Sequence, residues 1–538
     1  MSKRKSTKVT APTAAGAATK APSVGSRAFN RRTQAARQRT VRRKTKRSQT
    51  APVRLPPIRA LLRPIPRAAW ICALIACLNA ICWSILTPPF QIPDEPSHFA
   101  YTQRLAETES LPTSGQFSFS PEEEAVLTDL DFAGVRGRPG LGTISSTSEQ
   151  QTLQRNLSQR YARYGAGGVG GAYSSPPLYY LLQTIPYGLA SAGSLLDQLA
   201  LMRVFSALFG GLTALFAYLF LREALPKVPW AWTVGGLGVA LTPTLGYMSG
   251  AVNPDAMLFA VSAAIFYCLA RAFRHGLTRR LAVAIGVLTA VGFLTKLNFV
   301  GLAPGVVLGL IVLTVRTSRA YGRRDAIVSL GIALAVATSP LFLYAFINLL
   351  SNHPVLGRVS TAVGRSGSIF DAIGYIWQFY LPRLPGMSNH FPGLSTIRQV
   401  WFNKAVGFYG WLDTSFPLWV DSVALVPVAL VSLLGIRELA ASRGALRSRL
   451  PEVIVYGAMA VGLMGLIGAS AYAHPTESLS FAEPRYLLPL LPLVGAGLAL
   501  ASRGAGRRWG PPVGAIIVVI VLAHDIFSQM LVAGRYYG

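Results

Sequence analysis

Charged residues are scarce in this sequence. Asp, Glu, Lys and Arg together make up 14% of its 538 residues, whereas hydrophobic residues make up 51%. Soluble globular proteins carry roughly 25% charged residues, so this composition argues against an ordinary soluble enzyme. Long apolar runs without charges occupy much of the chain, and runs of about 20 such residues are typical of transmembrane helices. The sequence therefore predicts a polytopic membrane protein.

Cysteine is also scarce, and its placement excludes two kinds of site. The four cysteines all lie inside apolar runs, and none lies in a predicted loop or in a CxxC pair. This pattern excludes a disulfide framework and a cysteine metal site. We interpret these residues, which are Cys72, Cys77, Cys82 and Cys268, as small hydrophobic side chains.

Acidic residues are absent from residues 1–67, which hold 19 of the 51 Lys and Arg residues. This segment also lacks an apolar period, so it cannot bury enough surface to offset the entropy of ordering. We predict a disordered, basic, cytoplasmic tail that contacts anionic lipid. Charge alone also allows an arm that binds nucleic acid, but lipid is the partner that we favour.

Eleven apolar runs predict an all-α polytopic membrane domain over residues 68–538. The first run is followed by Pro88-Pro89-Phe90, which favours an anchored helix over a cleaved signal peptide. We expect about 11 transmembrane helices, near residues 68–90, 200–221, 229–248, 256–273, 280–295, 297–315, 326–349, 421–436, 453–473, 486–502 and 512–531.

The basic residues of the short connections predict the orientation in the membrane. Seventeen of them lie in alternate connections, near 222–227, 271–280, 316–324, 437–449 and 503–508. We therefore predict a cytoplasmic N-terminus and two large extracytoplasmic loops with interfacial helices, about 91–199 and 350–420. Residues 176–190 are apolar but short and contain Pro186, so we expect an interfacial or re-entrant helix there.

Four groups of polar residues fall on the predicted outer face. Asp94, Glu95 and His98 follow the first span, where a helix cap is the alternative to a catalytic role. Asn253 and Asp255 precede another span, and a turn with a first-turn acid is their alternative. The third group is Lys296 with Arg203, which membrane-surface snorkelling would also explain. The fourth group is Glu483, Arg485 and Tyr486.

Together these groups predict a site in which carboxylates face cations. A carboxylate takes a proton from an acceptor hydroxyl, while Arg and Lys stabilise a departing phosphate. A metal held by His98, His474 and the carboxylates stays open, although none of these residues has ligand spacing. His524-Asp525 is polar within an apolar run, and the sequence assigns it no role.

The order of these motifs resembles the GT-C superfamily of membrane glycosyltransferases, which use polyprenyl-phosphate sugars. The resemblance covers about residues 68–531. The sequence segments PDEPSHF, AVNPDA and RYLLPLLP most resemble an uncharacterised domain-of-unknown-function membrane family found in many actinobacteria. The matching segments are Asp94-Glu95, Ser175–Tyr180, Arg203–Leu208, Leu294–Lys296 and Glu483–Tyr486.

The resemblance implies a glycosyltransferase in the bacterial plasma membrane that inverts the anomeric carbon by direct displacement. Its acceptor would be a cell-envelope glycan or lipid. Asp94, with Glu95 beside it, would be the catalytic base, and Arg203, Lys296 and Arg485 would hold the phosphate. Neighbouring residues cannot both face the same way, so we favour Asp94. Some relatives bind a divalent metal through their acidic pair and others do not, so the resemblance leaves the metal open.

Two other functions compete with this hypothesis. A transporter or flippase of envelope precursors is the chief alternative, but such proteins usually carry midplane ionisable residues and repeated halves. Apart from His524-Asp525, the ionisable residues gather at predicted helix ends, and no repeat is visible. A scaffold that recruits partners through its tail would leave the outer charged groups unexplained.

Overall fold

The computed structural model describes residues 65–136, 146–159, 161–165, 167–225, 228–350, 368–391, 393–473 and 483–538. Nearly all of the predicted tail, and His474, lie outside these residues. Helices dominate the described part, and its only two strands are the short pair β1 (Phe408–Tyr409) and β2 (Thr414–Ser415). The predicted all-α class is therefore confirmed.

Within the described residues, nine helices are long and apolar enough to cross a membrane. Two of them begin with a tighter helical turn, η2 (Leu297–Leu302) before α14 and η4 (Pro484–Leu490) before α23. The nine are α3 (Arg67–Leu86), α9 (Leu195–Ala224), α12 (Pro254–His275), α14 (Ala303–Tyr321), α15 (Arg323–Leu350), α19 (Leu418–Ala441), α21 (Leu450–Ala473), α23 (Leu491–Gly504) and α24 (Gly506–Tyr537).

The predicted count of eleven is not confirmed, because the two other spans form shorter helices. The run at 229–248 is divided into α10 (Pro229–Ala240) and α11 (Pro243–Ser249). The break falls at Thr242, whose extended backbone is the conformation favoured before a proline. The run at 280–295 forms α13 (Arg279–Thr295), whose 17 residues are at the lower limit for a span.

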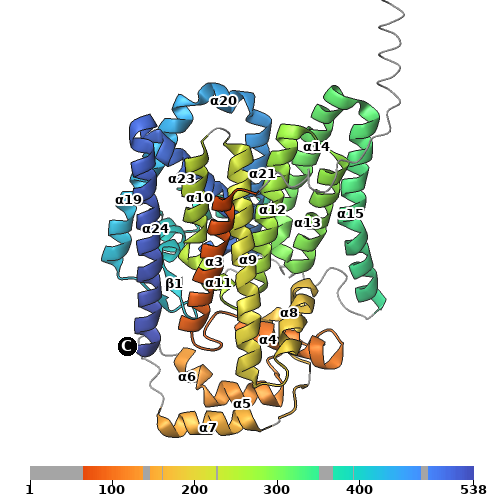
Figure 1. Cartoon of the computed structure of the whole chain (residues 1–538), viewed down its shortest axis with the longest axis vertical. Helices are drawn as coiled ribbons and strands as arrows, with labels where there is room; N and C mark the ends of the chain where they lie inside the picture. The colour runs from red at the N-terminus through yellow and green to blue at the C-terminus, as the bar shows by residue number, and fades with distance from the viewer. Residues whose placement is uncertain are drawn as a thin grey trace, which may run out of the picture. The chain divides into compact units, whose positions relative to one another are not determined.

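Short helices recur through the described parts of the two long loops, as the sequence predicts. Those of the first loop gather at one end of the bundle (Figure 1). Among them, α8 has 12 residues and is about 18 Å long, too short to cross a bilayer. The loop helices are α4 (Glu95–Thr108), α5 (Pro121–Asp129), α6 (Phe132–Arg136), α7 (Thr147–Ser158), η1 (Gly170–Ser174), α8 (Leu178–Leu189), α16 (Ile369–Tyr380), α17 (Leu394–Ile397), η3 (Arg398–Asn403) and α18 (Lys404–Val406).

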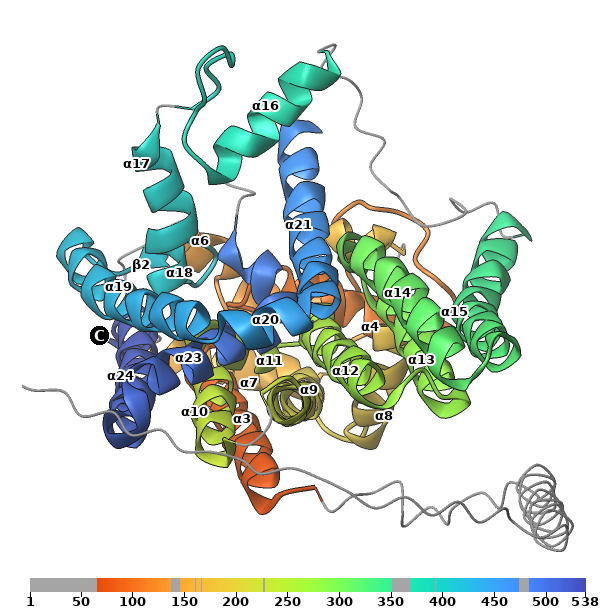
Figure 2. The same cartoon turned by 90° about the horizontal axis from the view of Figure 1, so that it is seen from above.

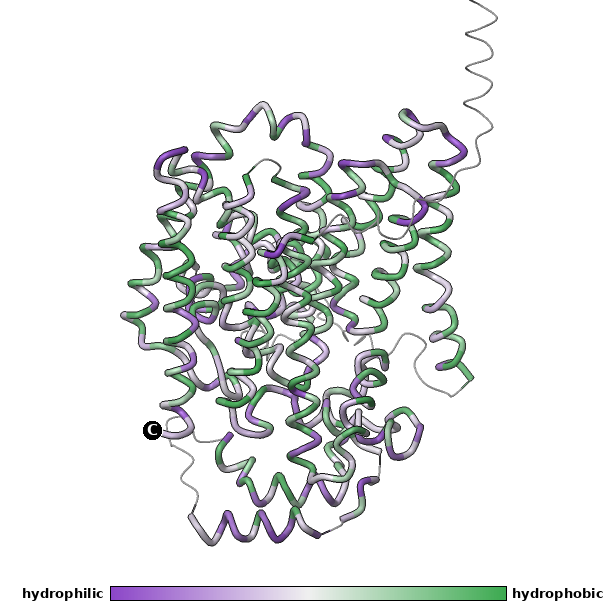
Figure 3. The backbone as a smooth tube through the Cα atoms, viewed as in Figure 1, coloured by the Kyte–Doolittle hydropathy of each residue, from purple (hydrophilic) through white to green (hydrophobic). Residues whose placement is uncertain are grey.

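Burial divides the long helices into a central and a peripheral set. The central helix α12 is almost wholly buried and packs along α9, whereas α15 and α19 expose most of their apolar residues at the periphery (Figure 2). Hydrophobic residues run along the bundle, and hydrophilic residues gather toward its ends, where α20 (Arg443–Ser448) lies opposite the loop helices (Figure 3). Apolar surface on the peripheral helices suits contact with lipid.

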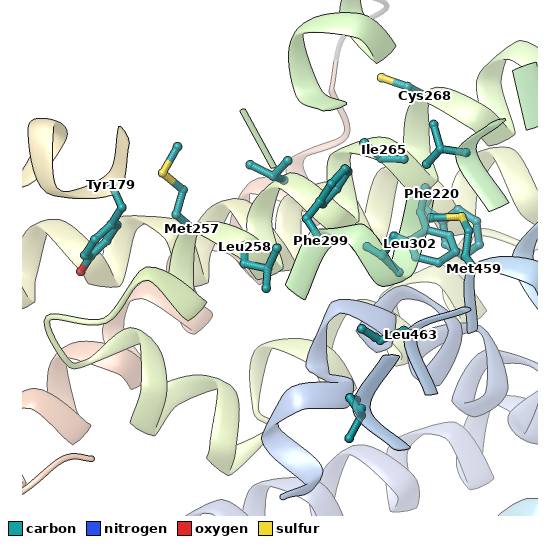
Figure 4. Close-up of a cluster of buried hydrophobic side chains, with 14 of the residues drawn as sticks. Tyr179, Phe220, Met257, Leu258, Ile265, Cys268, Phe299, Leu302, Met459 and Leu463 are labelled. Atoms are coloured by element: carbon teal, nitrogen blue, oxygen red, sulfur yellow. The ribbon is translucent and has the colours of Figure 1, made fainter. Parts of the chain in front are cut away.

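The core between α9, α12, η2 and α21 consists of interlocking aromatic and aliphatic side chains (Figure 4). Gly305 in α14 lets the backbone of α21 approach closely, because a Cβ atom there would lie 2.5 Å from the Met459 nitrogen. This packing holds the ends of α9, α12, η2 and η4 together, and these ends carry the charged residues described next.

Candidate active site

Glu95 and Arg203 form a buried ion pair. The Arg203 Nη2 to Glu95 Oε2 distance is 2.5 Å, and the two side chains are 4% and 0% exposed. Arg203 Nε also donates to Oε1 at 2.8 Å. The backbone amides of Phe90 and Val252 donate to the same carboxylate, each at 3.0 Å. Both Glu95 oxygens therefore accept two hydrogen bonds each, and neither is open to a substrate.

The Arg203 guanidinium is equally saturated. Beyond Glu95, it donates to the carbonyl oxygens of Ser84, Thr87 and Pro88 at 2.8–3.0 Å. A guanidinium has five N–H donors, and these contacts engage all five. All five Arg203 donors are thus engaged, which leaves none free for the predicted phosphate clamp. Arg203 ties the end of α3 to the start of α4, because its donors already serve backbone and Glu95 acceptors.

Asp94 differs sharply from its neighbour Glu95. Its backbone is left-handed, with φ of 65°, a conformation that Asp tolerates better than most residues. The side chain is 53% exposed, and its Oδ2 lies 3.6 Å from Arg485 Nη2. Asp94 occupies the N-cap position of α4, but its side chain makes no capping hydrogen bond. Of the adjacent pair, Asp94 is the carboxylate that is accessible.

The start of α12 places Asp255 beside Lys296. Asn253 caps this helix, because its Oδ1 accepts from the Asp255 amide at 2.9 Å. Lys296 lies between α13 and η2, and its Nζ is 2.7 Å from Asp255 Oδ1. The other Asp255 oxygen is buried without a hydrogen-bond partner among the described residues. The start of α12 thus carries a buried, unsatisfied carboxylate oxygen and a part-exposed ammonium.

Arg485 brings the remaining charges together. Its Nε lies 2.6 Å from Glu483 Oε2, while its buried Nη1 has no hydrogen-bond partner in the described part of the chain. The Tyr486 ring lies 5.2 Å from the Arg485 guanidinium and 5.9 Å from Lys296 Nζ. Both distances are within cation–π range, so this ring positions both cations. We call Asp94, Asp255, Lys296, Glu483 and Arg485 the Asp94 cluster.

His98 borders this cluster as a neutral side chain. Burial lowers the pKa of His98 to about 4, although Asp94 and Asp255 oppose this shift. The His98 Nδ1 lies 2.8 Å from the Tyr180 hydroxyl, in hydrogen-bonding contact. At neutral pH the ring is therefore uncharged, and it contributes hydrogen bonding rather than positive charge to the site.

Lys404 lies near Glu483 of the Asp94 cluster, and the sequence did not single it out. It lies at the start of α18, and burial lowers its pKa while Glu483 opposes that shift. In turn, burial raises the pKa of Glu483, and Arg485 and Lys404 oppose that change. The only signal in the sequence was that Lys404 is the single lysine of the aromatic-rich loop at 350–420.

The described residues contain no group of three or more His, Cys, Asp or Glu side chains placed to hold a metal. The adjacent acids do not fit a two-carboxylate metal site, because hydrogen-bond donors occupy both Glu95 oxygens. His474, the other histidine considered for such a site, lies outside the described residues.

This fold and site define a polytopic α-helical membrane protein with a charged cluster at one end of its bundle. Residues 77–494 match the family described as "Predicted membrane protein (DUF2142)", and the chain belongs to that family. The expected domain-of-unknown-function membrane family is thereby confirmed. No curated protein matches the chain.

Similar solved structures include the oligosaccharyltransferase of Archaeoglobus fulgidus in several states. Its apo form is 12% identical with a TM-score of 0.40, and 87% of this chain and 56% of that chain are covered. Its complex with an inhibitory peptide and a dolichol-phosphate has the same identity and coverage, with a TM-score of 0.41. This chain thus spans little more than half the length of that enzyme.

Proposed function

We propose that this protein is a glycosyltransferase that moves a sugar from a polyprenyl-phosphate donor to a cell-envelope glycan or lipid. The observation that carries the proposal is the contrast within the acidic pair. Glu95 is saturated by four donors, whereas Asp94 is half exposed and 3.6 Å from Arg485. An accessible carboxylate beside a buried guanidinium suits transfer from a phosphate-linked donor.

In the proposed reaction, Asp94 accepts the proton of the acceptor hydroxyl. The acceptor oxygen attacks the anomeric carbon, and the bond from that carbon to the phosphate oxygen breaks on the opposite face, which inverts the configuration. The phosphate leaves with the electron pair, and Arg485 and Lys296 stabilise its charge. The unpartnered Nη1 of Arg485 is the donor available to it.

We assign the residues around Asp94 the role of positioning the reacting groups. Glu95 and Arg203 hold the backbone that carries Asp94, since their hydrogen bonds reach Thr87, Pro88 and Phe90 before it and Val252 before α12. Tyr486 contacts both cations. Neutral His98 adds a hydrogen-bonding surface for substrate.

The proposed location is the extracytoplasmic face. Asp255 is at the start of α12, and Arg274 is near its end. At about 1.5 Å per residue, the two lie about 29 Å apart along the helix, close to the thickness of the hydrocarbon core. The arginine-rich end then faces the cytoplasm by the positive-inside rule, which supports an outward-facing Asp94 cluster.

A transporter or flippase remains the second candidate, and one feature of α24 favours it. Asp525 is an ionisable residue inside a candidate span, and such residues often mark transport pathways. However, Trp83 Nε1 donates to Asp525 Oδ1 at 3.1 Å, and Gln529 donates to Oδ2 at 3.2 Å. The Trp83 bond fastens α24 to α3, and the Gln529 bond satisfies the second oxygen within α24, which explains Asp525 without transport.

The experiment compares envelope glycans of a strain that lacks the protein with strains restored by wild type, Asp94→Asn, Asp525→Asn or Glu124→Gln. Glu124 is an exposed acid of α5 and serves as the matched control. Loss of one sugar in the deletion and Asp94→Asn strains alone would support transfer. Full restoration by Asp94→Asn with failure of Asp525→Asn would favour transport.

A further inference from the structure

A second charged cluster lies at the end of the bundle opposite the Asp94 cluster. The Glu223 carboxylate near the end of α9 is 2% exposed, and four basic side chains of α9 and α12 approach it. Their nitrogens lie 3.2–3.7 Å from its oxygens, and these residues are Arg222, Arg271, Arg274 and His275. We call these five residues the Glu223 cluster.

Two of these arginines keep most of their donors unused. Arg271 engages only Nη1, which contacts Glu223 and the Tyr267 hydroxyl. Arg274 also engages only Nη1, which contacts Glu223 and the Arg222 carbonyl oxygen. Their Nε and Nη2 groups have no hydrogen-bond partner in the described ranges, and the side chains are 21% and 39% exposed. Arg203, by contrast, engages all five of its donors.

The cluster also carries surplus positive charge. Three arginines face one carboxylate, so the sum is positive even when His275 is neutral. The cluster lies about 29 Å along α12 from Asp255, which is the depth of the opposite lipid headgroups. Guanidinium groups bind phosphate oxygens in a two-pronged geometry.

We propose that the Glu223 cluster binds the phosphodiester headgroup of an anionic phospholipid, through the free donors of Arg271 and Arg274. Basic pockets between transmembrane helices recognise such headgroups. Glu223 engages one nitrogen of each arginine and partly neutralises both, so it lowers their affinity for an anionic headgroup. This site is separate from the proposed transfer reaction and does not depend on it.

The test measures phospholipid binding to the purified full-length protein by native mass spectrometry. Phosphatidylglycerol and phosphatidylcholine are the two lipid probes, and inorganic phosphate at equal ionic strength is the competitor. The variant is R271Q/R274Q, and the matched control is R507Q/R508Q, which removes two exposed arginines where α24 starts, at the same end of the bundle. The basic tail is present in every variant, so its contribution cancels.

We expect R271Q/R274Q to weaken phosphatidylglycerol binding about 30-fold and the control to weaken it by less than about 3-fold. The variant Glu223→Gln should strengthen binding, because it frees the arginines. This opposite effect keeps the test decisive if R271Q/R274Q folds poorly. Equal losses in variant and control, or no gain in Glu223→Gln, would overturn the proposal. Displacement of the lipid by inorganic phosphate at similar affinity would overturn the headgroup assignment.

Discussion

Substitution of the two adjacent acids should have opposite consequences, because the structure gives them opposite environments. Glu95→Gln removes the charge that pairs with buried Arg203. It also replaces an acceptor by an amide that cannot accept from all four present donors. Breaking a buried ion pair by removing one partner costs about 3–5 kcal/mol, so the free energy of unfolding should fall by about that amount.

Asp94→Asn should leave stability almost unchanged. The Asp94 side chain is 53% exposed, and its only ion pair in the described chain is the 3.6 Å contact with Arg485. Arg485 is buried but keeps its 2.6 Å ion pair with Glu483, so loss of the longer contact with half-exposed Asp94 should cost about 0–1 kcal/mol. Loss of a general base, however, lowers a rate roughly 100- to 10,000-fold.

The assay measures both quantities on the same preparations. Denaturant unfolding in detergent micelles gives the free energy of unfolding, and the amount of sugar added to the envelope, at matched protein level in the membrane, gives the activity. Glu124→Gln is the control for a lost acidic charge. A stable Asp94→Asn protein with wild-type transfer would refute Asp94 as the base. A Glu95→Gln protein of wild-type stability would refute the saturated ion pair.

Three further results are expected. Folded His98 stays neutral down to a pKa of about 4, whereas the unfolded chain takes up the proton near 6.5. The unfolded state thus binds more protons in this window, so the free energy of unfolding should fall by about 3 kcal/mol from pH 6.5 to 4. His98→Gln should remove that slope, and an unchanged pH profile would contradict the neutral ring. Gly305→Ala should lower the free energy of unfolding by about 1–3 kcal/mol, because the added Cβ would overlap Met459. Gly457→Ala is the control, because the space around that glycine is open. Equal losses of stability in thermal unfolding would contradict the close approach of the helices. Removal of residues 1–60 should spare envelope transfer, and complete loss of transfer by a correctly inserted truncation would count against the proposed orientation.

Several features could be predicted from the sequence because they depend on local composition. Apolar runs of sufficient length predicted α3, α9 and α12 close to their observed bounds. The short run at 176–190, interrupted by Pro186, predicted a helix too short to span, and α8 is such a helix. Hydropathy is carried by consecutive residues, so no tertiary contact is needed to recognise it.

The tertiary structure decided which of these residues face one another and which donors remain free. Asp94 and Arg485 lie 391 positions apart, and only the folded chain brings the start of η4 within 3.6 Å of the residue that precedes α4. The sequence likewise grouped Arg203 with the other cations, but three backbone carbonyls and Glu95 consume its donors. Hydropathy is a property of segments, whereas the saturation of a charged side chain depends on backbone groups that only the folded chain brings within reach.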